Sequence, residues 1–420
     1  MHDAIATTTT TANQVRSTFR ALHNFVEEKV IDVAGPRRDN GPPVSRVALV
    51  AAACLASGCS FYVETSATST DGDGGMTDAQ QDDSGAMTGD AGLGCYGTGL
   101  VVVCPITQPP PSYVVSVATT FDTNVGGNCT VVQGSINNGP ITGACVVVAE
   151  DIVIEASMRG VGPRPIVFVA TKSLTVNATI DVASHRDSRG AGNSTTVCTN
   201  GTGPSGLGGG AGGAFGGGGG GGGGGGVATG GSTGPTSTPP TSLRGGCRGQ
   251  SGGSPVGIGG DGGHGGGVFY AIAGTNIDIT AGINASGEGG HGAVLSVVAG
   301  GGGGGGGGSG GMIGLDAPQV RVAGEVFANG GGGGGGSSAV ENAGGGHESQ
   351  SALAMPEGGT NAAGAGRGGR GAAGTTIAGE AGENRSVLTV GGGGGGGGAG
   401  YVQVWGTLTQ SGQISPPPVL

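Results

Sequence analysis

Four uninterrupted runs of glycine constrain this chain more than any other feature of its sequence. They lie at residues 216–226, 300–308, 330–336 and 391–398. Glycine has no side chain to bury and loses more backbone entropy on folding than any other residue. Because 106 of the 420 residues are glycine and only 3% are aromatic, the glycine-dense segments cannot build an ordinary hydrophobic core.

Short apolar segments between the glycine runs share one spacing, Φ-x-Φ-x-x-x-Φ, in which Φ is mostly apolar. The five copies are Ile152/Ile154/Met158, Leu174/Val176/Ile180, Ile277/Ile279/Ile283, Val320/Val322/Val326 and Leu408/Gln410/Ile414. Another apolar run precedes each copy, at residues 146–149, 166–170, 268–272, 312–315 and 401–405. Alternation with a period of two and many β-branched residues predict strands. The first two copies are 22 residues apart, which suits one coil of three short strands, so we expect an all-β fold built as a short β-solenoid.

The later copies are farther apart because extra chain enters at one place, after the third apolar position. These insertions cover roughly residues 184–266, 287–311 and 330–400 of a body that spans 146–415. We expect the coils to stack in register and the three glycine-rich arms to leave from one corner. The arms are expected either to be disordered or to pack as polyglycine-II helices with about three residues per turn. We favour partial order, with sparse apolar contacts from Phe215, Ile258 and Leu353.

The segment 44–59 has the layout of a bacterial export signal. Arg46 precedes the apolar run 47–53, which is too short to span a bilayer as a stable helix. Leu55-Ala-Ser-Gly-Cys59 resembles a lipobox, in which the cysteine of a bacterial lipoprotein is acylated. We therefore expect a signal peptide at 44–59 and lipidation of Cys59. Residues 1–43 are interpreted as a non-native or disordered extension, with translation starting at Val44.

The chain that follows the signal is acidic and poor in apolar residues. No Lys or Arg occurs between Glu64 and Asp90, so residues 60–94 are predicted to be a disordered, self-repelling tether. A calcium site at Asp71-Gly-Asp73 is the alternative, but the EF-hand spacing fails beyond it. Ser60, directly after the lipobox cysteine, resembles the residue found in lipoproteins sorted to the outer membrane.

The remaining cysteines open the folded part of the chain and suggest an oxidising compartment. They are Cys95, Cys104, Cys129, Cys145, Cys198 and Cys247. Local pairing (95–104, 129–145 and 198–247) is our hypothesis among several possible connectivities. A zinc site is the alternative, although no CxxC knuckle is present. Residues 95–145 are predicted to be a disulfide-bearing cap that covers the open end of the stack, and 416–420 to be a proline-rich tail.

One stretch of the body resembles a group of uncharacterised proteins. Arg164-Pro-Ile-Val-Phe-Val-Ala and Thr179-Ile-Asp-Val-Ala-Ser-His-Arg186, followed by polyglycine, are similar to segments of glycine-rich lipoproteins of myxobacteria. The resemblance covers residues 95–415 and implies a β-solenoid-like body, but no known activity.

A few polar residues are candidates for chemistry. Asp261, His264, Glu288 and His291 repeat an acid-x-x-His spacing, and His347-Glu348 is a third acid–imidazole neighbour. Such ligands suit zinc or manganese, but glycine loops position ligands poorly, so we interpret them as polar punctuation of solvated arms. His185-Arg186-Asp187 could be a turn or a catalytic fragment. Asp181, Asp278 and Asp316 could serve a β-helix carbohydrate enzyme, but they occupy non-equivalent repeat positions and are expected to face solvent.

Composition limits the function classes. The net charge is −11 and there is no basic patch, which argues against nucleic acid as a partner. We expect a non-enzymatic protein without cofactor, anchored by acyl chains in the outer membrane, at the cell surface or on the periplasmic face. Its expected role is structural or adhesive, with surface glycans or other envelope components as partners. The alternatives are a carbohydrate-active or glycan-binding β-helix protein and a metal-binding envelope protein.

Overall fold

The computed structural model describes residues 94–420, except 131, 137–138, 141–142, 187, 194–197, 238, 255–258 and 296–299. The predicted extension, the signal peptide with Cys59, and the tether up to residue 93 lie outside the described residues, as does Ile258. The chain divides into Met1–Asp82 and Asp83–Leu420, and the fold below concerns the second unit. Within the described residues, no helix is long and apolar enough to cross a membrane.

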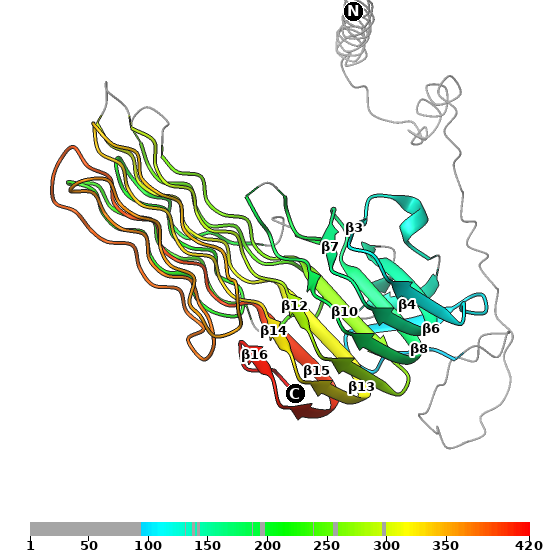
Figure 1. Cartoon of the computed structure of the whole chain (residues 1–420). Coiled ribbons are helices and arrows are strands. Elements are labelled where there is room, and N and C mark those ends of the chain that lie inside the picture. Colours follow the sequence, from blue (N-terminus) through cyan, green and yellow to red (C-terminus); the bar gives the residue numbers. More distant parts are fainter. Residues whose placement is uncertain are drawn as a thin grey trace, which may run out of the picture. The chain divides into compact units, whose positions relative to one another are not determined.

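The described chain is almost entirely β and extended structure, arranged as two lobes (Figure 1). One lobe, the β body, contains all the strands, and the other is an elongated bundle of extended glycine-rich segments, the glycine bundle. Gly126–Asn128 forms a short 3-10 turn, η1.

Two parallel sheets form the β body. The first contains β2 (Ser112–Val115), β6 (Cys145–Ile154), β8 (Ile166–Val176), β10 (Val268–Ala273), β11 (Asn276–Ile279), β13 (Met312–Val322) and β15 (Tyr401–Gln410). The second contains β3 (Thr119–Asp122), β7 (Met158–Val161), β9 (Ile180–Asp181), β12 (Gly282–Asn284), β14 (Glu325–Phe327) and β16 (Gln413–Ser415). The chain crosses from the first sheet to the second within each repeat, so successive repeats stack.

Strand pairing matches the predicted alignment of the repeat. Ile152 pairs with Leu174, Leu174 with Ile277, Ile277 with Val320, and Val320 with Leu408. The third apolar positions are likewise aligned from Met158 through Ile180, Ile283 and Val326 to Ile414. These side chains face one another between the sheets and form the main core, which explains why the apolar spacing could be read from the sequence.

Two features of the body differ from expectation. Four of the five predicted repeats contribute two strands rather than three, because the preceding apolar run and the first part of the motif merge into one long strand, with a bulge after Ala149 in β6. The repeat at 268–284 keeps the predicted three strands, β10, β11 and β12. A sixth repeat, β2 with β3, lies inside the predicted cap and pairs with β6 and β7. It was missed because Tyr113, Val115 and Thr119 occupy the motif positions, and the threonine hides the third apolar site.

The cap also lies in a different place from the one predicted. A small antiparallel sheet of β1 (Val101–Pro105), β4 (Val132–Ile136) and β5 (Gly139–Pro140) packs on the outer face of the first parallel sheet. Val101 and Val103 of β1 are buried against alternate residues of β6, β8 and β10. Those residues face away from the main core, so the sheet needs this second cover.

All three glycine-rich insertions leave after a strand of the second sheet and return at a strand of the first. They connect β9 to β10, β12 to β13 and β14 to β15. The described residues of the three insertions join into a single ordered bundle, rather than forming three separate arms (Figure 1). The bundle contacts the body through Phe215, which is buried with Val268, Met312 and Tyr401 at the starts of three strands.

Hydrogen bonds between the glycine segments repeat every third residue. Gly304, Gly307 and Gly310 donate to the carbonyls of Gly392, Gly395 and Gly398, each at 2.9 Å. The other peptide groups of the segment 302–311 form hydrogen bonds with five further segments, at 247–253, 285–291, 260–266, 210–213 and 331–337. A three-residue period is that of polyglycine-II geometry. Because successive peptide groups of the segment 302–311 bond to different neighbouring segments, that segment is surrounded on all sides.

Glycine is required in this interior because backbone meets backbone. A Cβ added to Gly306 would lie 2.0 Å from the carbonyl oxygen of Ala211, and one added to Gly305 would lie 2.0 Å from that of Asp261. Contacts below about 3.0 Å are not found for real Cβ atoms. Larger residues therefore appear on the outer segments, often at every third position, such as Arg367 and Arg370, which are exposed beside buried glycines.

Candidate functional site: polar grooves and an acid–imidazole network

A charged network joins the β body to the glycine bundle at His185. Its Nε2 lies 2.9 Å from Asp181 Oδ2 at the end of β9, and its Nδ1 lies 2.5 Å from Glu348 Oε2 in the third insertion. Arg159 of β7 forms an ion pair with Asp181 at 3.2 Å. The backbone N–H of Arg186 donates to Glu348 at 3.0 Å. The network thus links three segments that are far apart in the sequence.

The contacts of His185 set its protonation state. Hydrogen bonds to Asp181 and Glu348 raise the pKa of His185 to about 9. Burial alone would raise the pKa of Asp181, but the hydrogen bond from His185 and the charge of Arg159 outweigh it and lower that pKa. At neutral pH the ring is therefore a cation held between two carboxylates, and it has no free nitrogen with which to act as a general base. This geometry fits a structural clamp better than the catalytic fragment considered for residues 185–187, of which Asp187 lies outside the described residues.

An open groove runs beside this network on the outer face of the second sheet. Thr120, Arg159 and Asp181 lie in register on β3, β7 and β9. They border a hollow of about 490 Å³ to which Thr119, Ser157 and Thr179 add hydroxyl groups. A second hollow of about 620 Å³ shares Thr120 and Arg159 with the first and adds Ser188, Arg189 and Asn193. We call the two together the Arg159 groove.

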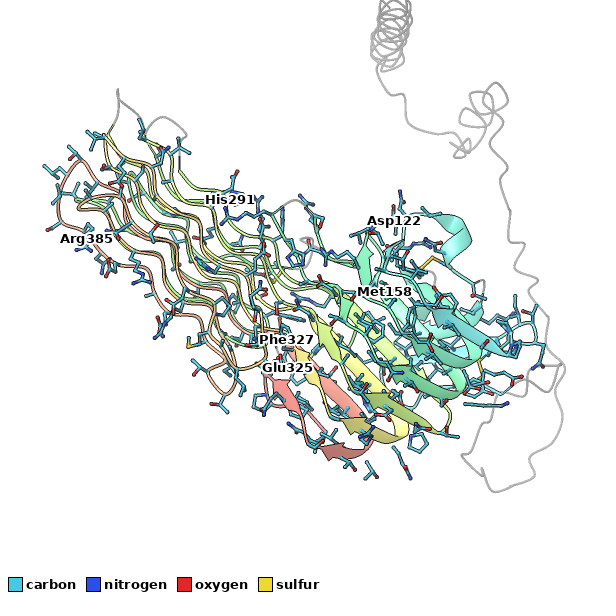
Figure 2. The ribbon with its side chains drawn as sticks, viewed as in Figure 1. Asp122, Met158, His291, Glu325, Phe327 and Arg385 are labelled. Carbon is cyan, nitrogen blue, oxygen red and sulfur yellow. A yellow bond between two sulfur atoms is a disulfide. The ribbon has the colours of Figure 1, made fainter. Side chains whose placement is uncertain are left out.

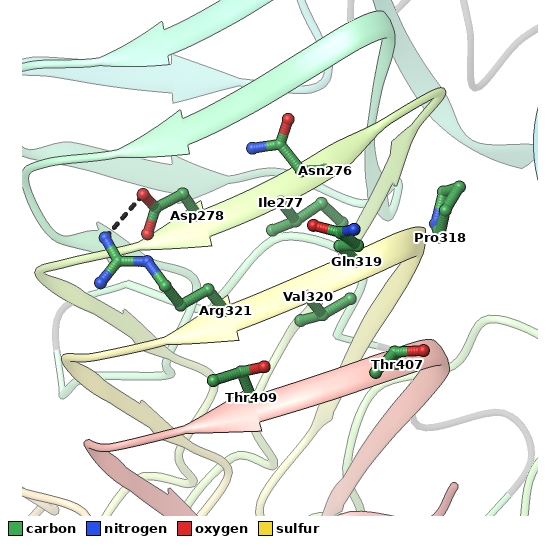
Figure 3. Close-up of a pocket in the computed structure, with 9 residues that line it drawn as sticks. All are labelled: Asn276, Ile277, Asp278, Pro318, Gln319, Val320, Arg321, Thr407 and Thr409. Carbon is green, nitrogen blue, oxygen red and sulfur yellow. Dashed lines mark hydrogen bonds and ion pairs between the residues drawn. The ribbon is translucent and has the colours of Figure 1, made fainter.

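A similar groove, the Arg321 groove, lies on the first sheet (Figure 3). Its volume is about 550 Å³, and its lining includes Asn276, Gln319 and Thr407 in one row and Asp278, Arg321 and Thr409 in the next. The guanidinium of Arg321 donates to Asp278 at 2.7 Å. Aligned hydroxyl, amide and charged groups of this kind can donate and accept hydrogen bonds with a polar ligand.

The three aspartates considered for catalysis do not share a site. Asp181 and Asp278 face different grooves on different sheets. Asp316 is only 3% exposed and accepts hydrogen bonds from the backbone N–H groups of Thr98 and Gly99, each at 2.7 Å. The prediction that Asp316 faces solvent was wrong, because the segment before β1 crosses over β13 and covers it. Asp316 holds that segment in place.

The acid-x-x-His residues are brought together in the bundle. Their two segments run antiparallel, so His291 N–H donates to the carbonyl of Asp261 and Glu288 N–H to that of His264, both at 2.8 Å. The buried Glu288 carboxylate lies 3.1 Å from His291 Nε2, and Figure 2 shows His291 at the bundle surface. Nevertheless, no group of three or more His, Cys, Asp or Glu among the described residues is placed to hold a metal ion.

The pKa of His264 is shifted in the opposite direction to that of His185. Burial, together with the nearby charges of Arg189 and Arg248, lowers the pKa of His264 to about 4. Its Nε2 accepts a hydrogen bond from Arg189 Nε at 3.3 Å. The imidazole is thus neutral at physiological pH and acts as an acceptor for a cation.

The six cysteines form the three disulfides proposed from their local spacing. Cys95 bonds to Cys104, Cys129 to Cys145, and Cys198 to Cys247. The zinc alternative is therefore wrong for these residues, because every thiol is used in a covalent bond.

Sequence reasoning missed Arg159, Arg189 and Arg321 as members of polar sites, and it paired Glu348 with His347 rather than with His185. The repeat alignment contains the signal for two of them, because Arg159 follows the third apolar position and Arg321 lies between the first two. No comparable signal exists for Glu348, which reaches His185 only through the folding of the third insertion. Comparison of the chain with protein families, with curated proteins and with solved structures found no match.

Proposed function

We propose that this protein is a non-enzymatic, lipid-anchored protein of the bacterial cell envelope with a structural or adhesive role. In this proposal the β body is a short β-solenoid, and the glycine bundle is a polyglycine-II assembly that it displays. The anchor is the acylated Cys59, in an outer membrane, and the acidic segment 60–94 is the tether.

The observation that carries the proposal is the fusion of all three insertions into one hydrogen-bonded bundle. Interior segments make backbone hydrogen bonds in several directions and are packed to backbone contact. Such a lattice is stiff and presents side chains only on its outside, at regular intervals. It supplies a shaped, polar surface, which is what a structural or adhesive role requires.

The local chemistry also supports a non-catalytic role. His185 is held as a cation, and the hydrogen bond it gives to Glu348, although opposed by burial, lowers the pKa of that carboxyl group. A general acid needs a carboxyl group whose pKa is raised toward neutrality. In the network at the junction the pKa of the Glu348 carboxyl group is instead lowered.

A glycan-binding role is the second candidate, and the hydroxyl-lined grooves favour it. Rows of Thr, Ser, Asn and Arg side chains cross both sheets in register. The third possibility, a metal-binding envelope protein, has no comparable support among the described residues.

The anchor and the role can be tested together in cells. Labelling with a palmitate analogue should mark the wild-type chain and fail with Cys59→Ala. Protease treatment of intact cells should then degrade the body if it is displayed outside. Attachment of cells to surfaces is compared between wild type, a deletion strain and a Gly306→Ala strain. Unchanged labelling of Cys59→Ala would refute the anchor, and unchanged attachment of the deletion strain would refute the adhesive role.

A further inference from the structure

Arg189 is a cation at the edge of the Arg159 groove, and no carboxylate among the described residues pairs with it. Most arginines in the β body and the bundle, including Arg159, Arg321 and Arg370, form ion pairs with Asp or Glu. Among the described residues, Arg189 instead has the neutral ring of His264 as its contact, through Nε. Its terminal nitrogens make no hydrogen bond to the described residues. They are therefore available to an anionic group, for which the planar guanidinium is well shaped.

Asn193 lines the same hollow and has an unused acceptor. Its side-chain NH₂ donates to the carbonyl of Gly265, which fixes the amide orientation and leaves Oδ1 as the free atom. Oδ1 is buried and has no hydrogen-bond partner. A buried acceptor without a donor is costly, and a ligand hydroxyl would remove that cost.

The rest of the groove adds hydroxyl groups on both sides of Arg159. Ser188 and Thr120 line the hollow of about 620 Å³ with Arg189, and Thr119, Ser157 and Thr179 line the adjoining hollow. A cation, an unused acceptor and a row of hydroxyl groups together match a ligand that carries both a carboxylate and several hydroxyls. Each hollow has the size of a site for a small ligand.

The overall charge of the chain narrows the choice of anion. A net charge of −11 repels highly charged polyanions at long range. Recognition must then come from short-range contacts to a ligand that carries one negative charge in each repeating unit. We infer that the Arg159 groove binds carboxylated sugars, with Arg189 on the carboxylate and Asn193, Ser188 and Thr120 on the hydroxyls. This inference deepens the proposed adhesive function and rests on it.

Binding of defined oligosaccharides to the purified full-length protein tests the assignment. The probes for calorimetric titration are hexagalacturonate, a hyaluronan hexasaccharide and, as a neutral control, maltohexaose. At least one acidic probe should bind, and Arg189→Gln should weaken it by about tenfold or more, the effect of losing one charge-assisted hydrogen bond. Arg367→Gln is the matched control, because it makes the same change at an exposed ion pair outside both grooves, and it should leave the affinity within about twofold.

Galacturonate monosaccharide distinguishes the source of the sugar. Stronger binding of the hexamer assigns the groove to an acidic polysaccharide, and equal binding assigns it to a free sugar acid. The inference is overturned if the folded protein binds neither acidic probe, if maltohexaose binds equally well, or if both variants lose affinity alike. Cells whose attachment depends on the protein while the purified protein ignores acidic sugars would overturn this inference alone and leave the adhesive role standing.

Discussion

Two adjacent glycines of the run 216–226 should change the stability of the bundle in opposite directions when each is replaced by alanine. A Cβ at Gly222 would lie 1.9 Å from the carbonyl oxygen of Gly209, whereas at Gly221 the nearest atom would be the carbonyl oxygen of Gly231 at 3.7 Å. Ordinary contact begins at about 3.4 Å, so the Gly222→Ala variant must push two segments apart by about 1.5 Å. The Gly221→Ala variant meets no such obstacle.

The magnitudes follow from packing and hydrogen bonding. Overpacking costs about 1–3 kcal/mol, and the separation weakens the bond from Gly209 N–H to Gly223, now 2.8 Å, at about 0.5–1.5 kcal/mol. Gly222→Ala should therefore destabilise the bundle by about 1.5–4.5 kcal/mol. Gly221→Ala should stabilise it by about 0.4–1 kcal/mol, because alanine has less freedom in the unfolded chain.

Hydrogen exchange measured by mass spectrometry on the native protein is the appropriate assay, because it reports the bundle separately from the β body. Peptides covering 207–231 should exchange faster in Gly222→Ala and no faster than wild type in Gly221→Ala. Equal acceleration in both variants would refute the backbone-contact packing, since glycine would then be needed only for its flexibility.

Three further predictions concern the body, its junction with the bundle, and the disulfide of the bundle. Asp316→Asn should lower the free energy of unfolding by about 1–3 kcal/mol and expose the segment before β1 to protease, whereas the surface variant Asp278→Asn should cost less than about 1 kcal/mol; equal effects in denaturant titrations would contradict the structural role of Asp316. The folded pKa of His185, about 9, exceeds its unfolded value, so the stabilisation from His185 should be complete below about pH 6.5 and lost as the pH rises through 9. Melting temperatures of His185→Gln measured against pH should lack this loss. A pH profile equal to that of the wild type would count against the clamp. Replacing Cys198 and Cys247 by serine should destabilise the bundle by about 2–4 kcal/mol in the same titrations, and a stability equal to wild type would show that the bond is dispensable.

The repeat of the β body could be predicted because one physical cause fixes it. Apolar side chains at Ile152, Leu174, Ile277, Val320 and Leu408 must enter the same core, so their spacing records the stacking. The strand count per repeat could not be predicted, because a bulge can join two apolar runs into one strand without changing the spacing. The first repeat was missed because Thr119 occupies a position that is apolar in every other copy.

The glycine bundle and the polar sites were harder to predict. A run of glycine has the same letters whether it is disordered or packed on all sides, and only neighbours from distant segments distinguish the two. A weak signal existed in the outer segments, where the exposed residues Glu357 and Thr360 are three positions apart, as are Arg367 and Arg370. The contact of His185 with Glu348 depends on how the third insertion returns to the body, which no local pattern encodes.

The position of segment 391–400 has a consequence for how the chain folds. This segment is the last glycine run to be synthesised, yet it lies at the centre of the bundle. It donates hydrogen bonds to 207–213, 331–337 and 380–383 and accepts them from 304–310, 217–223 and 366–372. Segments from all three insertions therefore need the segment 391–400 to complete their hydrogen bonds, and contacts between residues so far apart in sequence form slowly. The β body can grow repeat by repeat, but the bundle closes only after its final segment has arrived, so it must assemble after synthesis is nearly complete.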